Sequence, residues 1–570
     1  MWKQKTHNKE IEPVFIKKGY GKLLSRLLSQ RNIKLHNVDT FLFSDYKNLS
    51  HPYSLYGVEK AVDIFCKSVK NGESMAFWTD YDADGVLSGV MAKEMCNNFG
   101  IECTCMFSSR LEHGYGLNEK SVKEIKEKFK DKRIDLLFIL DSGTNSFNEI
   151  EELKKSLKCK IIIVDHHLPS ENYARNADAL ISWHFSKEPQ QEMCAAGEIF
   201  QFIRGIRWLT KKINPIEYLS LAALATVADV SPVVGDNRII VKNGLTEFAI
   251  NHVVSSGLKS LMRQSKIYGK NLTQHDVSFK IAPKINAVGR IFNPDIVFGL
   301  LIERDPDIAN NTAEYIMGYN EERKKIQKEI ETEAIKLAEK QNDKNGILVV
   351  GDSWHIGVVG IVASRLVEVF NKPSIVVGKM GKIWKGSGRS VKGVNLKEIL
   401  DTCPEIFETY GGHSGAVGVT VKPEMIGEAH KIFDKACDRY YSQKSISKEN
   451  VNYYDAMIDI PLLSPDTSTM LNNSLYPYCV ENNAEPIFMI PQARIIDTKL
   501  IEKETWRLLT FYIERKGKRC PYAFKFFTKK FGTELEGRLA DVLFTFPQHN
   551  TFGETKYSQF ELSAIDIVVK

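Results

Sequence analysis

Three short apolar runs in the first third of the chain each end directly at an acidic residue. They are Met75–Thr79, Leu136–Leu140 and Lys160–Val164, which lead into Asp80, Asp141 and Asp165. Apolar runs of this kind are expected for strands that are covered on both faces, as in a parallel α/β sheet. Because the carboxyl ends of parallel strands share one edge of the sheet, these acidic residues are predicted to meet in one small volume.

The first acidic segment, Asp80-Tyr81-Asp82-Ala83-Asp84-Gly85, alternates acids with small or aromatic residues. Asp82 and Asp84 can each point at a different metal ion, while Gly85 permits a tight turn into the next helix. Asp141 leaves a second strand and is placed to bridge two ions. Carboxylates packed together without such partners repel one another and become protonated, so the sequence predicts metal ions here.

The third segment, Asp165-His166-His167, adds imidazole groups. His166 is a candidate metal ligand, and His167 is placed for a contact to a proton or a phosphate. A fourth acid, Asp229, ends a mostly apolar helix at a similar edge. Oxygen ligands with one or two imidazoles suit Mn²⁺ or Mg²⁺ better than zinc. Two such ions side by side are the arrangement that hydrolyses phosphodiesters.

Each piece of this constellation also has a simpler interpretation. A lone Asp at a strand end is usually a helix cap, and a pair of histidines usually lies on the surface. The pattern Asp-x-Asp-x-Asp-Gly also resembles a calcium loop, although the glutamate of an EF-hand loop is missing. The occurrence of all the segments together, on strand ends and in this order, favours the metal centre.

Length and composition limit the wider possibilities. A chain of 570 residues is expected to form three or four domains. The net charge of +6 permits a polyanionic partner without requiring one. No run approaches membrane-spanning length, and the N-terminus has no apolar signal core. The ten cysteines are scattered, as expected for reduced thiols in a cytoplasmic protein.

The predicted fold class is α/β, with two α/β domains joined by a long helix and followed by a small β-barrel. An N-terminal helical segment is expected to pack on the first of these domains. The predicted bounds of the five parts are residues 1–50, 51–305, 306–343, 344–445 and 450–570. Within the second α/β domain, the strand candidates are Ile347–Val350 and Pro373–Val377, with a helix over Val358–Val369 between them.

The acidic motifs resemble those of the DHH phosphoesterase superfamily, and further stretches resemble the RecJ single-strand exonucleases within it. These stretches are Arg110–Leu117, Asp236–Arg238, Ala282–Arg290, Trp354–Gly360, Lys385–Ser390 and Gly411–Gly418. The resemblance runs from about residue 55 into the C-terminal region. It implies a DHH catalytic domain, a DHH-associated domain and an OB-fold-like barrel.

The resemblance also implies a two-metal core, whose ligands are Asp82, Asp84, Asp141, His166 and Asp229. His167 is expected beside these ligands, close to the reaction. Asp80 is expected to act as a catalytic carboxylate that orients a ligand or a water molecule. The division of the ligands between the two ions is left open.

The segment Gly386-Ser387-Gly388-Arg389-Ser390 has the chemistry of a site for a terminal phosphate. Backbone N–H groups freed by the glycines, the Ser387 hydroxyl and the Arg389 guanidinium could all point at one anion. A structural glycine turn with an exposed arginine is the simpler alternative. The resemblance places this pocket opposite the metals, so that a 5′-phosphate held there would bring the first phosphodiester to them.

Other candidate substrate-binding residues depend mainly on the match to the family motifs. His355 and His413 fit the pattern around the phosphate pocket, although a lone loop histidine more often bonds to backbone. Arg110 and Arg290 are expected to hold backbone phosphates further along the strand, although exposed arginines are usually only solvated.

The C-terminal region interleaves aromatic and basic residues, which suits a groove that stacks bases and follows the backbone of single strands. The candidates are Trp506, Lys518, Arg519 and Lys525. Some aromatic residues are expected to be barrel core instead, since Phe524 and Phe526 lie on one side of an alternating run. RecJ proteins carry a Pro-Phe-Gly-x-Gly-Asn-like turn, and this chain lacks both of its glycines at 477–482, which leaves the DNA path over this domain open.

The resemblance therefore implies an exonuclease that needs two Mn²⁺ or Mg²⁺ ions and degrades single-stranded DNA with a 5′-phosphate from the 5′ end into mononucleotides, in repair and recombination. A helicase and a single-strand-binding protein are candidate partners, and a monomer without membrane contact is expected. One alternative is a DHH enzyme that cleaves short RNA or cyclic dinucleotides. Another is an inactive DHH scaffold of a replication complex, and a pyrophosphatase is disfavoured by the long helix and the barrel.

Overall fold

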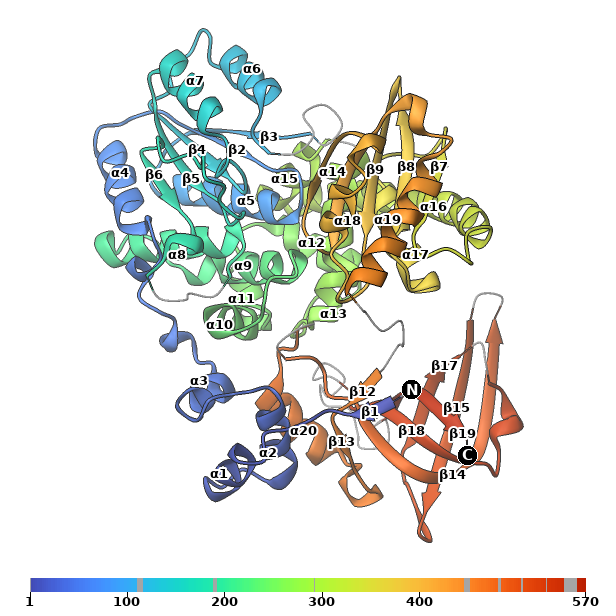
Figure 1. The fold of residues 1–570 in the computed structure, drawn as a ribbon. Coiled ribbons are helices and arrows are strands. Elements are labelled where there is room, and N and C mark those ends of the chain that lie inside the picture. Colours follow the sequence, from blue (N-terminus) through green and yellow to red (C-terminus); the bar gives the residue numbers. More distant parts are fainter. Residues whose placement is uncertain are drawn as a thin grey trace.

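The computed structural model describes most of the chain (Figure 1). It leaves out residues 1, 110–115, 188–191, 292, 445–451, 480–482, 504–505, 529–530, 548–560 and 570, and it describes only the backbone at 290, 291, 503 and 506. Among the described residues, no helix combines the length and the apolar character that a membrane crossing needs.

A parallel sheet forms the centre of the first block, residues 51–305. Its strand order is β3-β2-β4-β5-β6. The strands are β2 Met75–Thr79, β3 Cys103–Phe107, β4 Leu136–Leu140, β5 Lys160–Val164 and β6 Ala179–Ile181. The three apolar runs thus form strands with the predicted bounds, and β2, β4 and β5 are direct neighbours. All residues of β2 and β4 are buried.

Helices cover both faces of this sheet, which explains the burial of its strands (Figure 1). One face packs against α4 Val58–Lys70, α5 Ala83–Asn98, α8 Ala195–Thr210 and α9 Ile216–Ala228. The other face packs against α6 Glu119–Lys128 and α7 Phe147–Leu157. Successive residues of β4 alternate between the two cores, as the period of a strand requires.

The rest of the first block is helical. It comprises α10 Gly235–Gly244, α11 Glu247–His252, α12 Ser256–Gln264, α13 Gln274–Asp276, α14 Ala282–Ile291 and α15 Asp295–Ile302. The long helix α16, Pro306–Glu339, then leads to the second block. Asp305 caps its start by accepting hydrogen bonds from the N–H groups of Asp307 and Ile308.

The second block, residues 344–444, contains a mixed sheet of order β10-β11-β9-β8-β7. The strands are β7 Ile347–Gly351, β8 Ser374–Met380, β9 Ile383–Arg389, β10 Phe407–Gly412 and β11 Ala416–Val421. Only the β7–β8 pair is parallel among the described pairs. The helices are α17 Val359–Phe370, α18 Leu396–Asp401 and α19 Ala429–Lys444.

The C-terminal part closes into a five-stranded barrel. The strands are β14 Phe488–Lys503, β15 Trp506–Arg515, β17 Ala523–Phe527, β18 Leu539–Thr545 and β19 Glu561–Val569. Each pairs with two others in the circular order β14-β15-β17-β19-β18, and only β17 and β19 run parallel in this ring. Phe511, Phe524 and Phe526 fill the barrel, whereas Phe527 is exposed. The predicted fold class is confirmed.

The N-terminal segment does not pack where we expected it. Its helices α1 Ile11–Lys17, α2 Lys22–Gln30 and α3 Val38–Phe43 bury their apolar faces in the same core as the barrel and α20 Pro465–Leu475. The strand β1, Trp2–Gln4, pairs with β12, Asn452–Tyr454. The expectation was wrong because an amphipathic helix shows which face is buried but not which partner covers it.

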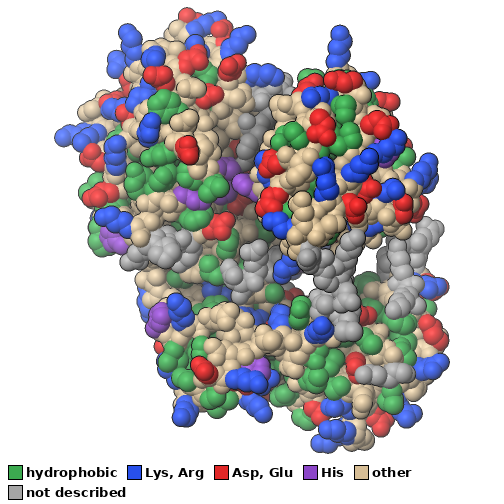
Figure 2. Space-filling model, viewed as in Figure 1, with side chains coloured by type: hydrophobic (Ala, Val, Ile, Leu, Met, Phe, Trp, Pro, Cys, Tyr) green, Lys and Arg blue, Asp and Glu red, His purple; other side chains and the backbone are tan. Residues whose placement is uncertain are grey.

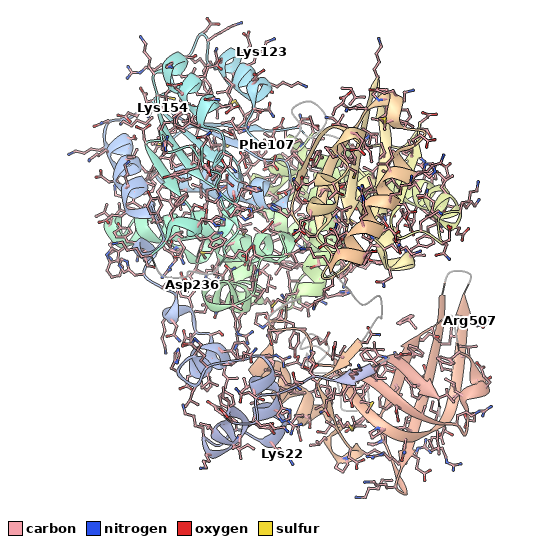
Figure 3. The ribbon with its side chains drawn as sticks, in the orientation of Figure 1. Lys22, Phe107, Lys123, Lys154, Asp236 and Arg507 are labelled. Atoms are coloured by element: carbon pink, nitrogen blue, oxygen red, sulfur yellow. The ribbon has the colours of Figure 1, made fainter. Side chains whose placement is uncertain are left out.

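One buried arginine joins the first block to this N-terminal and C-terminal unit. Arg238 on α10 donates hydrogen bonds to the carbonyls of Phe41, Leu475, Ser474, Tyr476 and Pro477. Its guanidinium also lies 4.0 Å from the centre of the Phe41 ring. Asp236 lies at the same end of the block (Figure 3) and accepts the Ser50 N–H at 3.1 Å. The start of the segment that lacks the family's glycines thus lies at this junction.

Replacing Arg238 with methionine is expected to destabilise the junction by roughly 3 kcal/mol, because the buried carbonyls lose their donors. The midpoint of urea unfolding and the rate of proteolysis between the units should report this loss. Arg365→Met is the matched control, since Arg365 is half-exposed and pairs with Glu331 and Glu368. A midpoint for R238M equal to that of the control would contradict the role of Arg238.

Candidate metal centre

The loop after β2 carries the first set of carboxylates. Asp82 caps α5 by accepting the N–H groups of Asp84 and Gly85 at 2.9 and 3.3 Å. Gly85 is required here, because a Cβ would lie 2.4 Å from the carbonyl oxygen of Asp80. The carboxylate of Asp80 accepts a hydrogen bond from the Ser108 hydroxyl. The capped turn therefore holds three acids in one short loop.

Helix α14 supports this loop by direct contact. The side-chain oxygen of Asn286 accepts the Ala83 N–H at 2.8 Å. A Cβ at Gly289 would lie 2.4 Å from the carbonyl oxygen of Tyr81, so a glycine lets the helix approach. The position of the acidic loop thus depends on two residues of the Ala282–Arg290 stretch.

Asp141 has an unusual backbone at the end of β4. Its φ is 55°, in the left-handed region, where non-glycine residues are uncommon. The residue is almost fully buried, and its Oδ1 accepts no hydrogen bond from the described residues. The Nε2 atom of His166 lies 3.3 Å from this oxygen. A buried carboxylate oxygen without a donor is the chemistry of a metal ligand.

The two histidines after β5 are held differently. His167 Nδ1 lies 2.6 Å from Asp165 Oδ1 and donates to it, which fixes the orientation of the imidazole. Asp165 also accepts the Thr144 N–H at 2.8 Å. The His166 carbonyl accepts a hydrogen bond from the His184 ring at 2.9 Å. The imidazole of His167 and the backbone of His166 are thereby held from outside the site.

Asp84 and Asp229 complete the cluster on the side of α8 and α9. The N–H groups of Ala195 and Ala196, at the start of α8, donate to Asp84 at 2.7 and 2.9 Å. A helix N-terminus favours such an anion. Asp229 lies at the end of α9 and accepts the Ser231 hydroxyl at 2.7 Å. The acid that the sequence places at the end of an apolar helix thus reaches the same site.

Three overlapping groups could each hold an ion, because the donor atoms within each lie no more than 4.8 Å apart. The groups are Asp84-His166-Asp229, Asp141-His166-His167 and Asp80-Asp82-Asp141. Asp141 and His166 each belong to two of them. The structure thus brings all seven predicted metal-site residues together, and their oxygen and imidazole donors fit Mn²⁺ or Mg²⁺.

Crowding of these acids disturbs their ionisation. Burial, and then the charge of Asp82, raises the pKa of Asp80 to about 7. Burial and Asp84 likewise raise the pKa of Asp229 to about 7. Burial, with Asp84 and Asp82, raises the pKa of Asp141 well above its usual range. Burial lowers the pKa of His166, but Asp229 and its neighbours outweigh this and raise it to about 9.

Divalent metal is expected to stabilise the protein more at pH 8 than at pH 6. The folded pKa values near 7 exceed the ordinary value for Asp, so these carboxyls favour the metal-free fold at low pH and lose that contribution as pH rises through about 7. A bound metal ion offsets the cost of burying the ionised carboxylates together. Below about pH 7, the metal must compete with protons for these carboxylates. Excess Mn²⁺ should raise Tm by roughly 5–10 °C at pH 8.

The measurement is thermal unfolding with Mn²⁺ or EDTA at both pH values. An Mn²⁺-induced rise in Tm that is equal at pH 6 and pH 8 would contradict this electrostatic account. The same scans on Asp63→Asn, a change at an exposed position of α4, are expected to match those of the wild type.

The predicted phosphate segment of the second block lies in a strand rather than in a loop. Residues 386–389 belong to β9, which pairs with β8 on one side and β11 on the other. Their backbone N–H groups therefore form hydrogen bonds within the sheet. The expectation that the glycines free these groups for an anion was wrong. The side chains alternate along the strand instead, and they place Ser387 and Arg389 on the same face. Arg389 Nη1 donates to the Ser387 hydroxyl at 2.8 Å.

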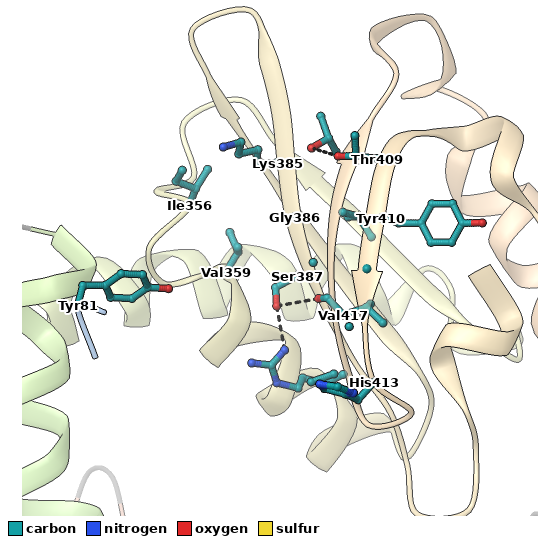
Figure 4. Close-up of a pocket in the computed structure, with 17 residues that line it drawn as sticks. Tyr81, Ile356, Val359, Lys385, Gly386, Ser387, Thr409, Tyr410, His413 and Val417 are labelled. Carbon is teal, nitrogen blue, oxygen red and sulfur yellow. Dashed lines mark hydrogen bonds between the residues drawn. The ribbon is translucent and has the colours of Figure 1, made fainter. Parts of the chain in front are cut away.

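These side chains line a pocket of about 630 Å³ on the sheet (Figure 4). Tyr81, from the acidic loop of the first block, faces it. A second pocket of about 330 Å³ includes Asp141 and His167. Gly412 and His413 line both pockets. Histidine side chains gather on the hollowed face between the two blocks (Figure 2).

The remaining predicted residues lie elsewhere or outside the described residues. His355 does not belong to the described lining of the larger pocket, and its Nδ1 accepts the Gly357 N–H at 3.1 Å. Arg110 and the side chains of Arg290 and Trp506 lie outside the described residues. On the barrel, Arg519 pairs with Asp497 and Lys525 with Glu561. Lys518 is exposed on β16, Lys518–Arg519.

Sequence reasoning missed several groups that shape the centre. Asp165 was seen as part of the motif but not as the partner of His167. The start of α8 was not considered at all, although its small residues Ala195 and Ala196 allow close approach to Asp84. Glu198 on α8 is fully buried and accepts the Trp183 N–H at 2.8 Å, and burial raises its pKa well above its usual range. The sequence feature that could have identified Glu198 is a glutamate within an otherwise apolar helix.

Comparisons with known proteins agree with this architecture. The model of the DHH family, N-terminal domain, matches residues 74–226, and that of the DHHA1 domain matches residues 342–439. The single-stranded-DNA-specific exonuclease RecJ of Bacillus subtilis is 30% identical over 488 residues, which cover 84% of this chain and 60% of that protein. The RecJ of Escherichia coli is 29% identical over 472 residues, 79% of each chain.

A solved structure has the same overall fold. The crystal structure of RecJ from Thermus thermophilus in complex with Mn²⁺ superposes with a TM-score of 0.80. The superposition covers 98% of this chain and 78% of that chain, at 22% sequence identity. Both α/β blocks and the C-terminal barrel therefore lie within a known arrangement.

Proposed function

The chain belongs to the RecJ group of the DHH family, and on that premise we propose that it hydrolyses single-stranded DNA from the 5′ end into 5′-mononucleotides. One observation carries the proposal. Gly412 and His413 line both the pocket that contains Asp141 and the pocket that contains Arg389. A strand held by its end in the second block can therefore reach the metal ligands of the first block.

The chemistry of the larger pocket supports the proposed direction of digestion. Arg389, Ser387 and His413 are suited to a terminal phosphate, because a guanidinium and a hydroxyl both donate to phosphate oxygens. A 5′-phosphate bound there leaves the next phosphodiester to extend toward Asp141 and His167. Cleavage then starts at the 5′ end and removes one nucleotide at a time.

At the metal centre, the proposed ligands are Asp82, Asp84, Asp141, His166 and Asp229. Two bound Mn²⁺ or Mg²⁺ ions would supply a water molecule of lowered pKa and positive charge beside the phosphate. Asp80, held by Ser108, would orient a ligand or that water. Asp165 outweighs the effect of burial and raises the pKa of His167 to about 9 in the metal-free site. We propose that its imidazole, which borders the pocket of Asp141, contacts the phosphate.

The same premise supports the wider setting as proposals. The substrate would be single-stranded DNA that arises in repair and recombination, supplied by a helicase and covered by a single-strand-binding protein. The exposed Lys518 and Arg519 of the barrel are candidate contacts to the strand. The seven intact carboxylate and histidine side chains of the centre argue against an inactive scaffold.

The test uses DNA strands of one sequence, labelled at the 5′ or the 3′ end, with or without a 5′-phosphate, and incubated with Mn²⁺. The wild type is expected to release labelled mononucleotides from the 5′-labelled strand at once and to shorten the 3′-labelled strand stepwise. Asp141→Ala should release nothing. Digestion from the 3′ end, or cleavage of only very short oligonucleotides, would contradict the proposal.

A further inference from the structure

We propose that the pocket of the second block holds a second anion subsite, next to that for the terminal phosphate, which accepts the outer phosphates of a 5′-triphosphate end. The inference rests on the proposed function and extends it to a further class of substrate. The second subsite is formed by Lys385, Thr409 and Thr420.

The strand register places these residues in one row beside the first subsite. On β9, Lys385 lies on the same face as Ser387 and Arg389, because side chains alternate along a strand. Thr420 of β11 is paired with Lys385, and Thr409 of β10 is paired with Thr420. The hydroxyl of Thr409 donates to that of Thr420 at 3.0 Å. Lys385 and this hydroxyl pair lie at one end of the pocket (Figure 4).

The two subsites are close enough for one oligophosphate. Lys385 is two residues from Ser387, which corresponds to about 7 Å along an extended strand. The long side chain of lysine can shorten that distance by reaching toward Ser387. A triphosphate can therefore place its first phosphate beside Ser387 and Arg389 and its outer phosphates beside Lys385.

Glycines keep the space between the subsites open. Gly418 is paired with Ser387, and Gly411 is paired with Gly418. A Cβ built on either glycine would meet no atom within 4 Å among the described residues. The pocket volume of about 630 Å³ exceeds what a single phosphate needs. The surface of the pocket at Gly411 and Gly418 therefore has no side chains where a linear polyanion would lie.

The charge of the pocket also favours a polyanion. The described residues that line it include Lys385, Arg389 and His413 but no aspartate or glutamate. The neighbouring metal centre has the opposite character, with its cluster of carboxylates. A group with several negative charges is therefore attracted to the pocket.

The direction of the strand decides what can occupy the second subsite. The nucleotide chain leaves the first subsite past Gly412 and His413 toward the metal ligands. Lys385 lies on the side of Ser387 that faces away from His413 (Figure 4). Thr420 pairs with Lys385 at that end of β9, whereas Ala416 pairs with Arg389 at the other end. Only a substituent on the 5′ side of the terminal phosphate reaches the second subsite.

The reaction at such an end balances as an ordinary hydrolysis. Water adds to the phosphorus of the second nucleotide, and the bond from that phosphorus to the 3′ oxygen of the first nucleotide breaks. The 3′ oxygen leaves with a proton. The products are a nucleoside 5′-triphosphate and a strand with a new 5′-monophosphate. The second turnover then proceeds as on an ordinary 5′-phosphorylated strand.

The experiment compares strands of one sequence that carry a 5′-triphosphate or a 5′-monophosphate, with products separated by chromatography. The wild type should release a nucleoside triphosphate from the first strand, with kcat/KM at least equal to that for the second. Lys385→Met should lower the ratio of the two kcat/KM values by about 10-fold, as expected for one lost charge-assisted contact. Lys379→Met, on the exposed end of β8, is the matched control and should leave the ratio unchanged.

A second variant tests whether the space at Gly418, between the two subsites, is needed. Gly418→Val fills the space between the subsites with a residue that suits a strand, and it should likewise lower the triphosphate-to-monophosphate ratio. A wild type that degrades the monophosphate strand but not the triphosphate strand would overturn this inference alone. Release of pyrophosphate from the triphosphate strand would also overturn it, whereas release of dinucleotides from the monophosphate strand would count against the proposed function. Failure on both strands would overturn the proposed function itself.

Discussion

Asp141→Asn is expected to lower kcat by roughly 10²- to 10³-fold, the scale seen when one group that stabilises transition-state charge is removed. Asp141 belongs to two of the three candidate metal groups, and asparagine is a poorer metal ligand because it carries no charge. The fold should persist, since the φ of 55° at this position suits asparagine well. The measurement is the initial rate of nucleotide release from 5′-phosphorylated single strands with saturating Mn²⁺.

The control for this prediction is Asp63→Asn, which makes the same change on the exposed face of α4. Asp63 pairs only with Lys67 among its described ion pairs, so its variant should keep the wild-type rate. A rate for D141N within a few-fold of wild type, with unchanged metal content, would show that Asp141 does not serve the reaction.

Arg389→Met is expected to lower kcat/KM for 5′-phosphorylated strands by roughly 100-fold, because the variant loses a charge-assisted, bidentate contact to the phosphate. It should also remove the preference for a 5′-phosphate over a 5′-hydroxyl. Arg389→Lys should recover only part of the loss, since a lysine cannot present two parallel donors. The measurement is kcat/KM on strands with either 5′ group.

The control for the arginine is Arg365→Met on α17, whose guanidinium pairs with Glu331 and Glu368 at the surface. It should retain both the rate and the preference. An Arg389→Met enzyme that still favours 5′-phosphorylated strands would place the terminal phosphate somewhere else.

The metal centre could be predicted from the sequence because its signals are local. Each apolar run ends where its strand ends, and parallel strands bring Asp80, Asp141 and His166 to one edge. The ligand side chains therefore follow from the fold class and from the motifs. The left-handed backbone of Asp141 and the contact of α8 with Asp84 depend on tertiary packing, which no local pattern shows.

The second block and the N-terminal segment show where such reasoning stops. Glycines in a run such as 386–388 are typical of a loop, but here they lie in a central strand because β8 and β11 pair with it. The apolar face of α2 predicts burial without naming the barrel core as its partner. Arg238 was noted only as part of a motif, and its contacts to Phe41 and Pro477 required the folded junction.

Two metal ions are proposed to lie close together at the strand ends of the first block. Electron paramagnetic resonance of the protein with two equivalents of Mn²⁺ tests this arrangement most directly. The overlap of the candidate groups at Asp141 and His166 predicts a magnetically coupled Mn²⁺ pair, which Asp141→Asn should abolish. A spectrum of isolated Mn²⁺ alone in the wild type would contradict the two-metal account.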